Sequence, residues 1–163
     1  MGAQAVTGSL NTGGCQCGAV RFRCEGEMGR ASICHCRMCQ KAFGSFFAPL
    51  VSVHKAKLAW TRGEPSHFQS SRTIRRGFCK DCGTPLTYEH PGGVELAIGA
   101  FDHPEKFEPQ VQVNFECRLP WIETLFEKRA ITPPIETNDM VSFQHPDCDV
   151  PDWTPPSGRN WSS

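Results

Sequence analysis

The chain has 163 residues, with 17 basic and 17 acidic side chains and therefore a formal net charge of zero at pH 7. This length suits one domain with an appended tail, and a neutral chain lacks the electrostatic footprint of a nucleic-acid-binding protein. No run approaches the roughly 20 apolar residues of a membrane span, and the opening MGAQAVTGSL lacks the pattern of a signal peptide. We therefore expect a cytoplasmic protein that binds neither nucleic acid nor membranes.

Short apolar–polar alternations between glycine and proline turns predict an all-β fold of small sheets with few helical turns. The ordered region is expected to open at Gly13 and Gly14. A turn then runs into a strand, in which Val20, Phe22 and Cys24 alternate with Arg21, Arg23 and Glu25. The further predicted strands are, in chain order, a segment ending near residue 36, a segment from about Ser45, and residues 57–61, 67–71, 73–79, 86–90 and 94–100.

Helical periodicity is scarce. One helical turn is predicted around 37–42, and one short helix is predicted in WIETLFEKR after Pro120. The composition divides the chain into an N-terminal arm (1–12), a domain (13–131) and a tail (132–163) that holds six of the 13 prolines. We expect the tail to be extended, either packed on the domain through Phe143, Trp153 and Trp161 or partly disordered.

Ten cysteines in a reducing compartment indicate metal ligands or catalytic groups before disulfides. Cys15 and Cys17 are two residues apart, so in an extended segment both sulfurs face the same side. Cys79 and Cys82 form a Cys-x-x-Cys turn, followed by a glycine that can adopt a positive φ. Together the two pairs predict a closed, structural zinc site with four thiolates that joins an early strand to a later hairpin.

Three further cysteines, Cys34, Cys36 and Cys39, occupy six positions. Three protein ligands with one open position are the arrangement of catalytic zinc sites. His35 alternates to the opposite side of the extended segment and is a poor fourth ligand; it is left as a structural residue or a supporting acid or base. Two alternatives stand beside an open site: a site closed by Cys24, Cys117 or Cys148, or a metal-free cluster of low-pKa thiols. Cys24 itself is most simply a small core residue.

Four segments in order, GGCQCGAVRF, CHCRMC, FCKDCGTPL and ECRLPW, resemble the glutathione-dependent formaldehyde-activating (GFA) and centromere protein V domain family over roughly residues 13–125. The resemblance implies a β-rich scaffold pinned by zinc, with two zinc ions per chain. It implies structural zinc ligands at Cys15, Cys17, Cys79 and Cys82, and ligands of a catalytic zinc at Cys34, Cys36 and Cys39. Cys117 stands where the family pattern has serine.

The activity implied by this resemblance is that of a carbon–sulfur lyase on S-hydroxymethylglutathione, the adduct of formaldehyde and glutathione. A small thiol or aldehyde is the expected partner. Carboxylates of such a thiol could be held by Arg37, by Lys41 or by the group Arg72–Arg76. The cluster of Arg72, Arg75, Arg76 and Lys80 is otherwise expected to be a solvated surface. A zinc-binding scaffold module and a thiol redox switch are the alternatives to an enzyme.

Overall fold

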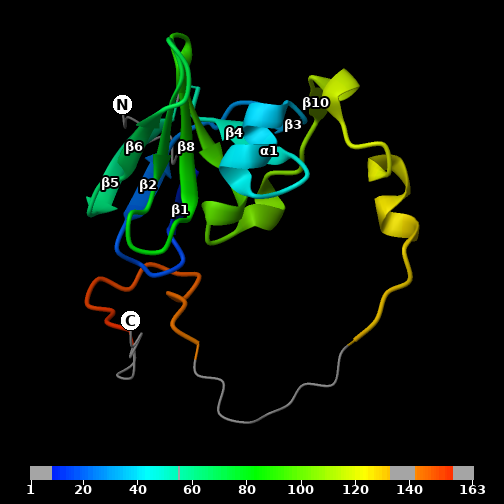
Figure 1. Cartoon of the computed structure of the whole chain (residues 1–163). Helices are drawn as coiled ribbons and strands as arrows, with labels where there is room; N and C mark the ends of the chain where they lie inside the picture. The colour runs from blue at the N-terminus through cyan, green and yellow to red at the C-terminus, as the bar shows by residue number, and fades with distance from the viewer. Residues whose placement is uncertain (1–8, 55, 133–141, 156–163) are drawn as a thin grey trace, which may run out of the picture.

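The computed structural model of the chain describes residues 9–54, 56–132 and 142–155 and is mostly β (Figure 1). Its smaller sheet has the order β1-β2-β5 and is antiparallel throughout. These strands are β1 (Leu10–Gly14), β2 (Arg21–Glu25) and β5 (Lys57–Arg62). The predicted all-β class is therefore confirmed.

The larger sheet has seven strands in the described residues, in the order β10-β3-β4-β9-β8-β7-β6. Its strands are β3 (Ala31–Cys34), β4 (Ala48–Ser52), β6 (Ser66–Gln69), β7 (Arg75–Phe78), β8 (Pro85–His90), β9 (Gly93–Ala97) and β10 (Val111–Val113). All neighbours are antiparallel except β10, which pairs with β3 in parallel. This parallel pair brings the segment after residue 113 next to the end of β3.

The α-helix α1 (Arg37–Phe43) follows β3, and Gly44 ends it with φ of 56°. Short 3₁₀ helices cover η1 (Ile98–Ala100), η2 (Pro104–Lys106), η3 (Phe115–Cys117) and η4 (Ile122–Glu127). No helix in the described ranges is long and apolar enough to cross a membrane.

The main core contains side chains from both sheets. Phe22 of β2 meets Phe101 and Trp60 edge to face, with ring centroids 5.1 and 5.9 Å apart. Leu86 and Leu96, from the larger sheet, are fully buried in the same cluster. Cys24 is also fully buried there, as predicted for a small core residue.

Several predicted boundaries were wrong. β1 begins at Leu10, three residues before the expected start of order, and β10 was not predicted. The strand expected from Ser45 begins at Ala48, and residues 98–100 leave the sheet as a 3₁₀ turn because β9 ends at Ala97. The short helix predicted after Pro120 is present, as a 3₁₀ helix. Arg21, expected on the solvent side of its strand, is 3% exposed because Asp102 pairs with its guanidinium.

Residues 142–155 return beneath the sheets and lie against the loop between β1 and β2 (Figure 1). The backbone N–H of His145 donates to the carbonyl of Gln16 at 2.8 Å, and Arg62 donates to the carbonyls of Val150 and Pro151. Trp153 is half-buried, with its ring centroid 4.9 Å from that of His145. The tail therefore packs on the domain in this range; Trp161 lies outside the described residues.

Candidate metal centres

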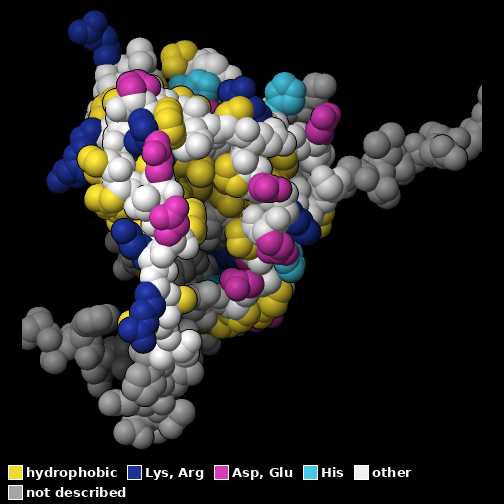
Figure 2. Space-filling view, turned by 90° about the vertical axis from the view of Figure 1, so that its right-hand side faces the viewer, with side chains coloured by type: hydrophobic (Ala, Val, Ile, Leu, Met, Phe, Trp, Pro, Cys, Tyr) yellow, Lys and Arg dark blue, Asp and Glu magenta, His cyan; other side chains and the backbone are white. Residues whose placement is uncertain are grey.

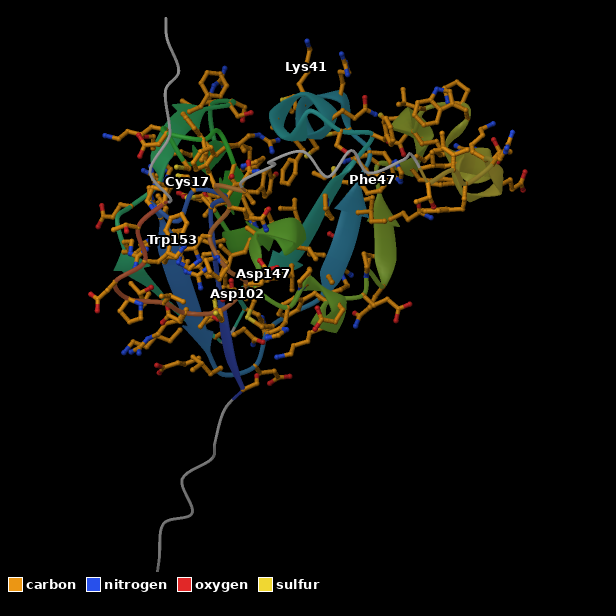
Figure 3. All side chains as sticks on the ribbon, turned by 90° about the horizontal axis from the view of Figure 1, so that it is seen from below. Cys17, Lys41, Phe47, Asp102, Asp147 and Trp153 are labelled. Atoms are coloured by element: carbon orange, nitrogen blue, oxygen red, sulfur yellow. The ribbon has the colours of Figure 1, made fainter. Side chains whose placement is uncertain are left out.

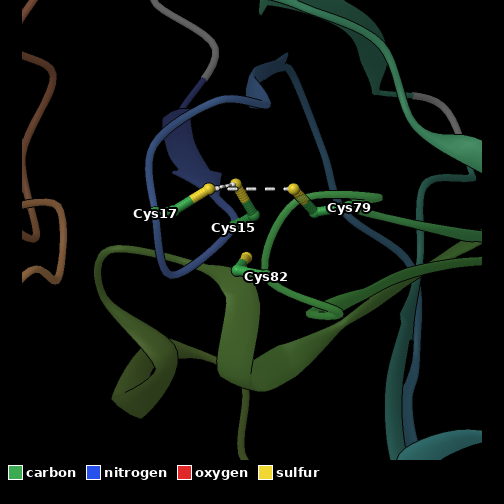
Figure 4. Close-up of side chains that lie close together, drawn as sticks. All are labelled: Cys15, Cys17, Cys79 and Cys82. Atoms are coloured by element: carbon green, nitrogen blue, oxygen red, sulfur yellow. Dashed lines mark hydrogen bonds between the residues drawn. The ribbon is translucent and has the colours of Figure 1, made fainter. Parts of the chain in front are cut away.

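Two cysteine clusters lie in the described structure, and the four-cysteine cluster joins two distant loops. Cys15 and Cys17 come from the β1–β2 loop, and Cys79 and Cys82 come from the β7–β8 turn (Figure 4). All four sulfurs lie within 4.8 Å of one another, with Sγ–Sγ distances of 3.6 Å for Cys15–Cys17 and 3.8 Å for Cys17–Cys79. Sulfurs 2.3 Å from one tetrahedral centre would lie about 3.8 Å apart, so the four thiols fit a zinc ion.

Backbone hydrogen bonds shape both loops. The Gly18 N–H donates to the carbonyl of Cys15, and the Cys15 N–H donates to the carbonyl of Val20, so residues 15–18 form the predicted turn that leads into β2. On the other loop, the N–H of Gly83 donates to the carbonyl of Cys79 at 2.8 Å. Gly83 adopts φ of 76°, as the predicted tight turn requires.

The tail covers one side of this cluster. A Cβ atom added to Gly18 would lie 2.4 Å from Cδ2 of His145, so the imidazole packs directly on the loop. Cys15 and Cys79 are 3% and 0% exposed, and burial raises the pKa of the Cys15 thiol. Burial would raise the pKa of Cys82 too, but hydrogen bonds from Thr84 outweigh it and lower this pKa to about 6.

The three-cysteine cluster is built within one short stretch of chain. Cys34 ends β3, Cys36 is the N-cap of α1, and Cys39 lies in its first turn. Their sulfurs lie within 4.8 Å of one another, so they could also hold a metal ion. The Cys36 sulfur accepts the Cys39 N–H at 3.4 Å, which fixes the entry to the helix.

Two side chains distant in sequence donate to this cluster. Asn114, just after β10, donates from Nδ2 to Cys34 Sγ at 3.3 Å. Arg76 of β7 donates from Nη2 to Cys39 Sγ at 3.4 Å. The hydrogen bond from Cys39 lowers the pKa of Cys34 to about 5, and the same interaction, with burial, raises the pKa of Cys39.

The thiols of the alternative, closed site do not join the cluster. Among the described residues, no further histidine, cysteine, aspartate or glutamate completes the group of Cys34, Cys36 and Cys39. Cys24 lies in the main core, Cys148 is exposed in the tail, and Cys117 is exposed on η3. The alternative of a site closed by one of these thiols is therefore not supported by the geometry.

His35 lies on the side expected from strand alternation, away from the three sulfurs. It is 1% exposed, its Nε2 is 2.8 Å from Oε1 of Gln112, and its ring packs edge to face on Phe47 and Phe115. These rings border a hollow of about 760 Å³ between the sheet and η4, where hydrophobic side chains gather (Figure 2).

Sequence reasoning missed the roles of Arg76 and Asn114. Arg76 was placed in a solvated basic cluster, but it is 7% exposed, whereas the neighbouring Arg75 pairs with Glu89. Alternation of side chains along β7 could have separated Arg76 from Arg75. Asn114 adopts φ of 51°, which asparagine tolerates better than most residues, but no local pattern connects it to Cys34.

The sequence model for "Glutathione-dependent formaldehyde-activating enzyme" matches residues 10–117 of the chain. The chain belongs to this family. A Schizosaccharomyces pombe protein described as an uncharacterized lyase is 30% identical over 81 residues, and the match spans 50% of this chain and 58% of that protein. A crystal structure of a Rhodobacter sphaeroides protein is similar over 63% of this chain and 99% of its own, with a TM-score of 0.48 and 21% identity.

Proposed function

We propose that this member of the GFA family is a zinc-dependent carbon–sulfur lyase-type enzyme that acts on a small aldehyde–thiol adduct, of which S-hydroxymethylglutathione is the type. The observation that carries the proposal is the incomplete donor set formed by Cys34, Cys36 and Cys39. Three thiolates leave one of the four tetrahedral positions of zinc for a substrate atom.

The two clusters have different proposed roles. Cys15, Cys17, Cys79 and Cys82 hold a structural zinc, because four thiolates fill its coordination shell. Cys34, Cys36 and Cys39 hold a catalytic zinc, which gives two zinc ions per chain. A zinc ion with an open position lowers the pKa of a bound thiol and polarises a carbonyl group.

In the direction of adduct formation, the thiol sulfur bonds to the carbonyl carbon, and the proton lost from sulfur is found on the former carbonyl oxygen of the product. Cleavage of the adduct reverses these changes. The chain's own residues fix the site. Asn114 and Arg76 each donate to one ligand sulfur, which orients the sulfurs and reduces their negative charge. Half-buried Cys34 and Cys36 leave the cluster accessible to a small substrate.

The proposed catalytic unit is the domain of residues 13–131 extended to the start of β1, and the proposed compartment is the cytoplasm, where thiols stay reduced. A scaffold role on chromatin or microtubules would favour a strong positive net charge, whereas this chain is formally neutral at pH 7.

Exchange spectroscopy by NMR on an equilibrated mixture of formaldehyde and glutathione tests the activity, because it separates catalysed exchange from the rapid uncatalysed reaction. We expect zinc-loaded protein to raise the exchange rate in proportion to its concentration, and we expect Cys36→Ser to return the rate to the blank. Serine is itself a good N-cap, so this variant removes a thiolate without uncapping α1. An exchange rate equal to the blank with fully zinc-loaded wild type would contradict the proposal.

A further inference from the structure

One face of the molecule leaves its apolar side chains uncovered. Nine large hydrophobic side chains are exposed in the described residues, and six of them come from Phe46 and residues 111–131: Phe46, Val113, Phe115, Trp121, Phe126 and Ile131. Phe46 packs edge to face on Trp121, with ring centroids 4.7 Å apart, and Phe126 is 90% exposed. Figure 2 looks onto this face and shows hydrophobic side chains among charged ones. We term the surface of residues 111–131 and Phe46 the η4 face.

The helices of the η4 face have little core of their own. None of the residues of η3 or η4 is buried, and η4 lies to one side of both sheets (Figure 1). Ile122 and Phe126 of η4 line the hollow of about 760 Å³, and Phe47 and Phe115 line it as well. A short helical segment gains most of its stability from burial of an apolar side, so a surface that covered η4 would stabilise it.

The charges at the end of η4 have both signs and no partner in the described structure. Glu127, Lys128 and Arg129 follow Phe126 directly. None of the three forms an ion pair with a described residue. When two copies of this segment cross antiparallel about a two-fold axis, the acidic residue of each copy lies opposite the basic residues of the other. A partner of one charge sign would match only part of this pattern, which favours a second copy.

We propose that the η4 face is the interface of a homodimer, in which Phe126 of each copy enters the hollow beside η4 of the other. The rings of Phe47 and Phe115 in the hollow offer edge-to-face contacts to an inserted phenyl group. Two-fold symmetry uses the same surface on both chains, so each contact is made twice. The formal net charge of zero removes long-range repulsion between copies. The inference does not depend on the proposed enzymatic activity.

Sedimentation velocity on full-length, zinc-loaded protein tests the interface. We expect wild type to convert from monomer to dimer with a Kd in the micromolar range or below, as for interfaces of standard size. Phe126→Ser should raise the Kd about tenfold or more, because aromatic side chains at the centre of an interface contribute most to binding. Phe68→Ser is the matched control and should keep the wild-type Kd. Phe68 is also an exposed phenylalanine, but it lies on β6, at the opposite end of the larger sheet from β10.

Charge inversion tests the two-fold arrangement. Glu127→Lys gives the segment three basic residues, and Lys128→Glu with Arg129→Glu gives it three acidic residues. Each protein alone should dimerise more weakly than wild type, because like charges lie opposite each other. An equimolar mixture of the two proteins should associate at least as tightly as wild type does.

Three results would overturn the proposal. The first is a wild type that stays monomeric up to millimolar concentration, and the second is a dimer that Phe126→Ser leaves unchanged. The third is a mixture of the charge-inverted proteins that associates no better than either protein alone. Melting curves show whether each variant is folded. A monomeric wild type whose melting temperature falls with Phe126→Ser would also contradict the proposal, because the rest of the same chain would then cover the η4 face.

Discussion

The two cysteine clusters use the same donor atom in opposite surroundings. The four-cysteine cluster joins loops 62 residues apart and is covered by the tail, whereas the three-cysteine cluster lies within one strand–helix junction beside a cationic pocket. Figure 3 shows that the two regions lie apart. Cys17 lies near Trp153 on one side, and Lys41 and Phe47 lie on the other. The difference supports the proposed division of roles: a metal held by four thiolates would join two distant loops, whereas a local site with one ligand fewer leaves a position for a substrate.

The largest expected effect is the loss of the four-cysteine clip. Cys79→Ser should leave the chain largely unfolded at 37 °C, because a structural zinc contributes on the order of 10 kcal/mol, which is comparable to the whole stability of a small domain. Far-ultraviolet circular dichroism and zinc content per chain measure this result.

Cys36→Ser is the matched variant from the other cluster. It should keep a melting temperature within a few degrees of wild type while losing one zinc and the exchange activity. Equal destabilisation by Cys79→Ser and Cys36→Ser would contradict the division into a structural and a catalytic site.

Loss of the buried ion pair between Arg21 and Asp102 should have the next largest effect on stability. Arg21 donates to both carboxylate oxygens of Asp102, at 2.8 and 2.6 Å, and both side chains are at most 4% exposed. Asp102→Asn should lower the free energy of unfolding by about 3 kcal/mol at pH 7, because it leaves a buried guanidinium with only the longer contact to Asp149, at 3.9 Å. Urea unfolding measures the difference between the two proteins.

The pH dependence of this difference checks its origin. Burial would raise the pKa of Asp102, but the hydrogen bonds from Arg21 and Thr12 outweigh it and hold the pKa below its ordinary value. The stabilisation is therefore complete above the unfolded pKa, about 3.9, and is lost as the pH falls through the lower folded value. A difference that shrinks already between pH 7 and pH 5 would show that another group is responsible.

The smallest effect concerns the tail. Arg62→Gln removes donors to the carbonyls of Val150 and Pro151 and should cost about 1 kcal/mol. It should speed transfer of zinc from the four-cysteine cluster to a chromogenic chelator and leave release from the other cluster unchanged. Faster zinc release from the three-cysteine cluster instead would contradict this prediction, because it would show that the tail protects that cluster.

The sequence predicts the residues that are grouped locally. Seven cysteines fall into the two predicted clusters, since spacing alone brings each short motif to one side of its turn. Contacts across the sheet were not predictable in the same way. The parallel pairing of β10 with β3 brings Asn114 to Cys34, and the register of β7 brings Arg76 to Cys39, whereas neither pairing leaves a local pattern in the chain.

The burial of Arg21 illustrates the same limit. Alternation predicts that an arginine between two apolar residues lies on the polar side of a strand. The carboxylate of Asp102, 81 positions away, pairs with the Arg21 guanidinium and makes its burial favourable. Sequence alternation carries no information on such a distant partner.

The central claim is that one metal centre is closed and the other is open. Zinc-edge X-ray absorption on wild type and Cys36→Ser, both purified without chelator or added thiol, tests it most directly. We predict two zinc ions in wild type, with a mixed shell of sulfur and one lighter ligand at the second site, and one all-sulfur zinc in Cys36→Ser. Two all-sulfur zinc ions in wild type, or a single zinc in both proteins, would contradict the account.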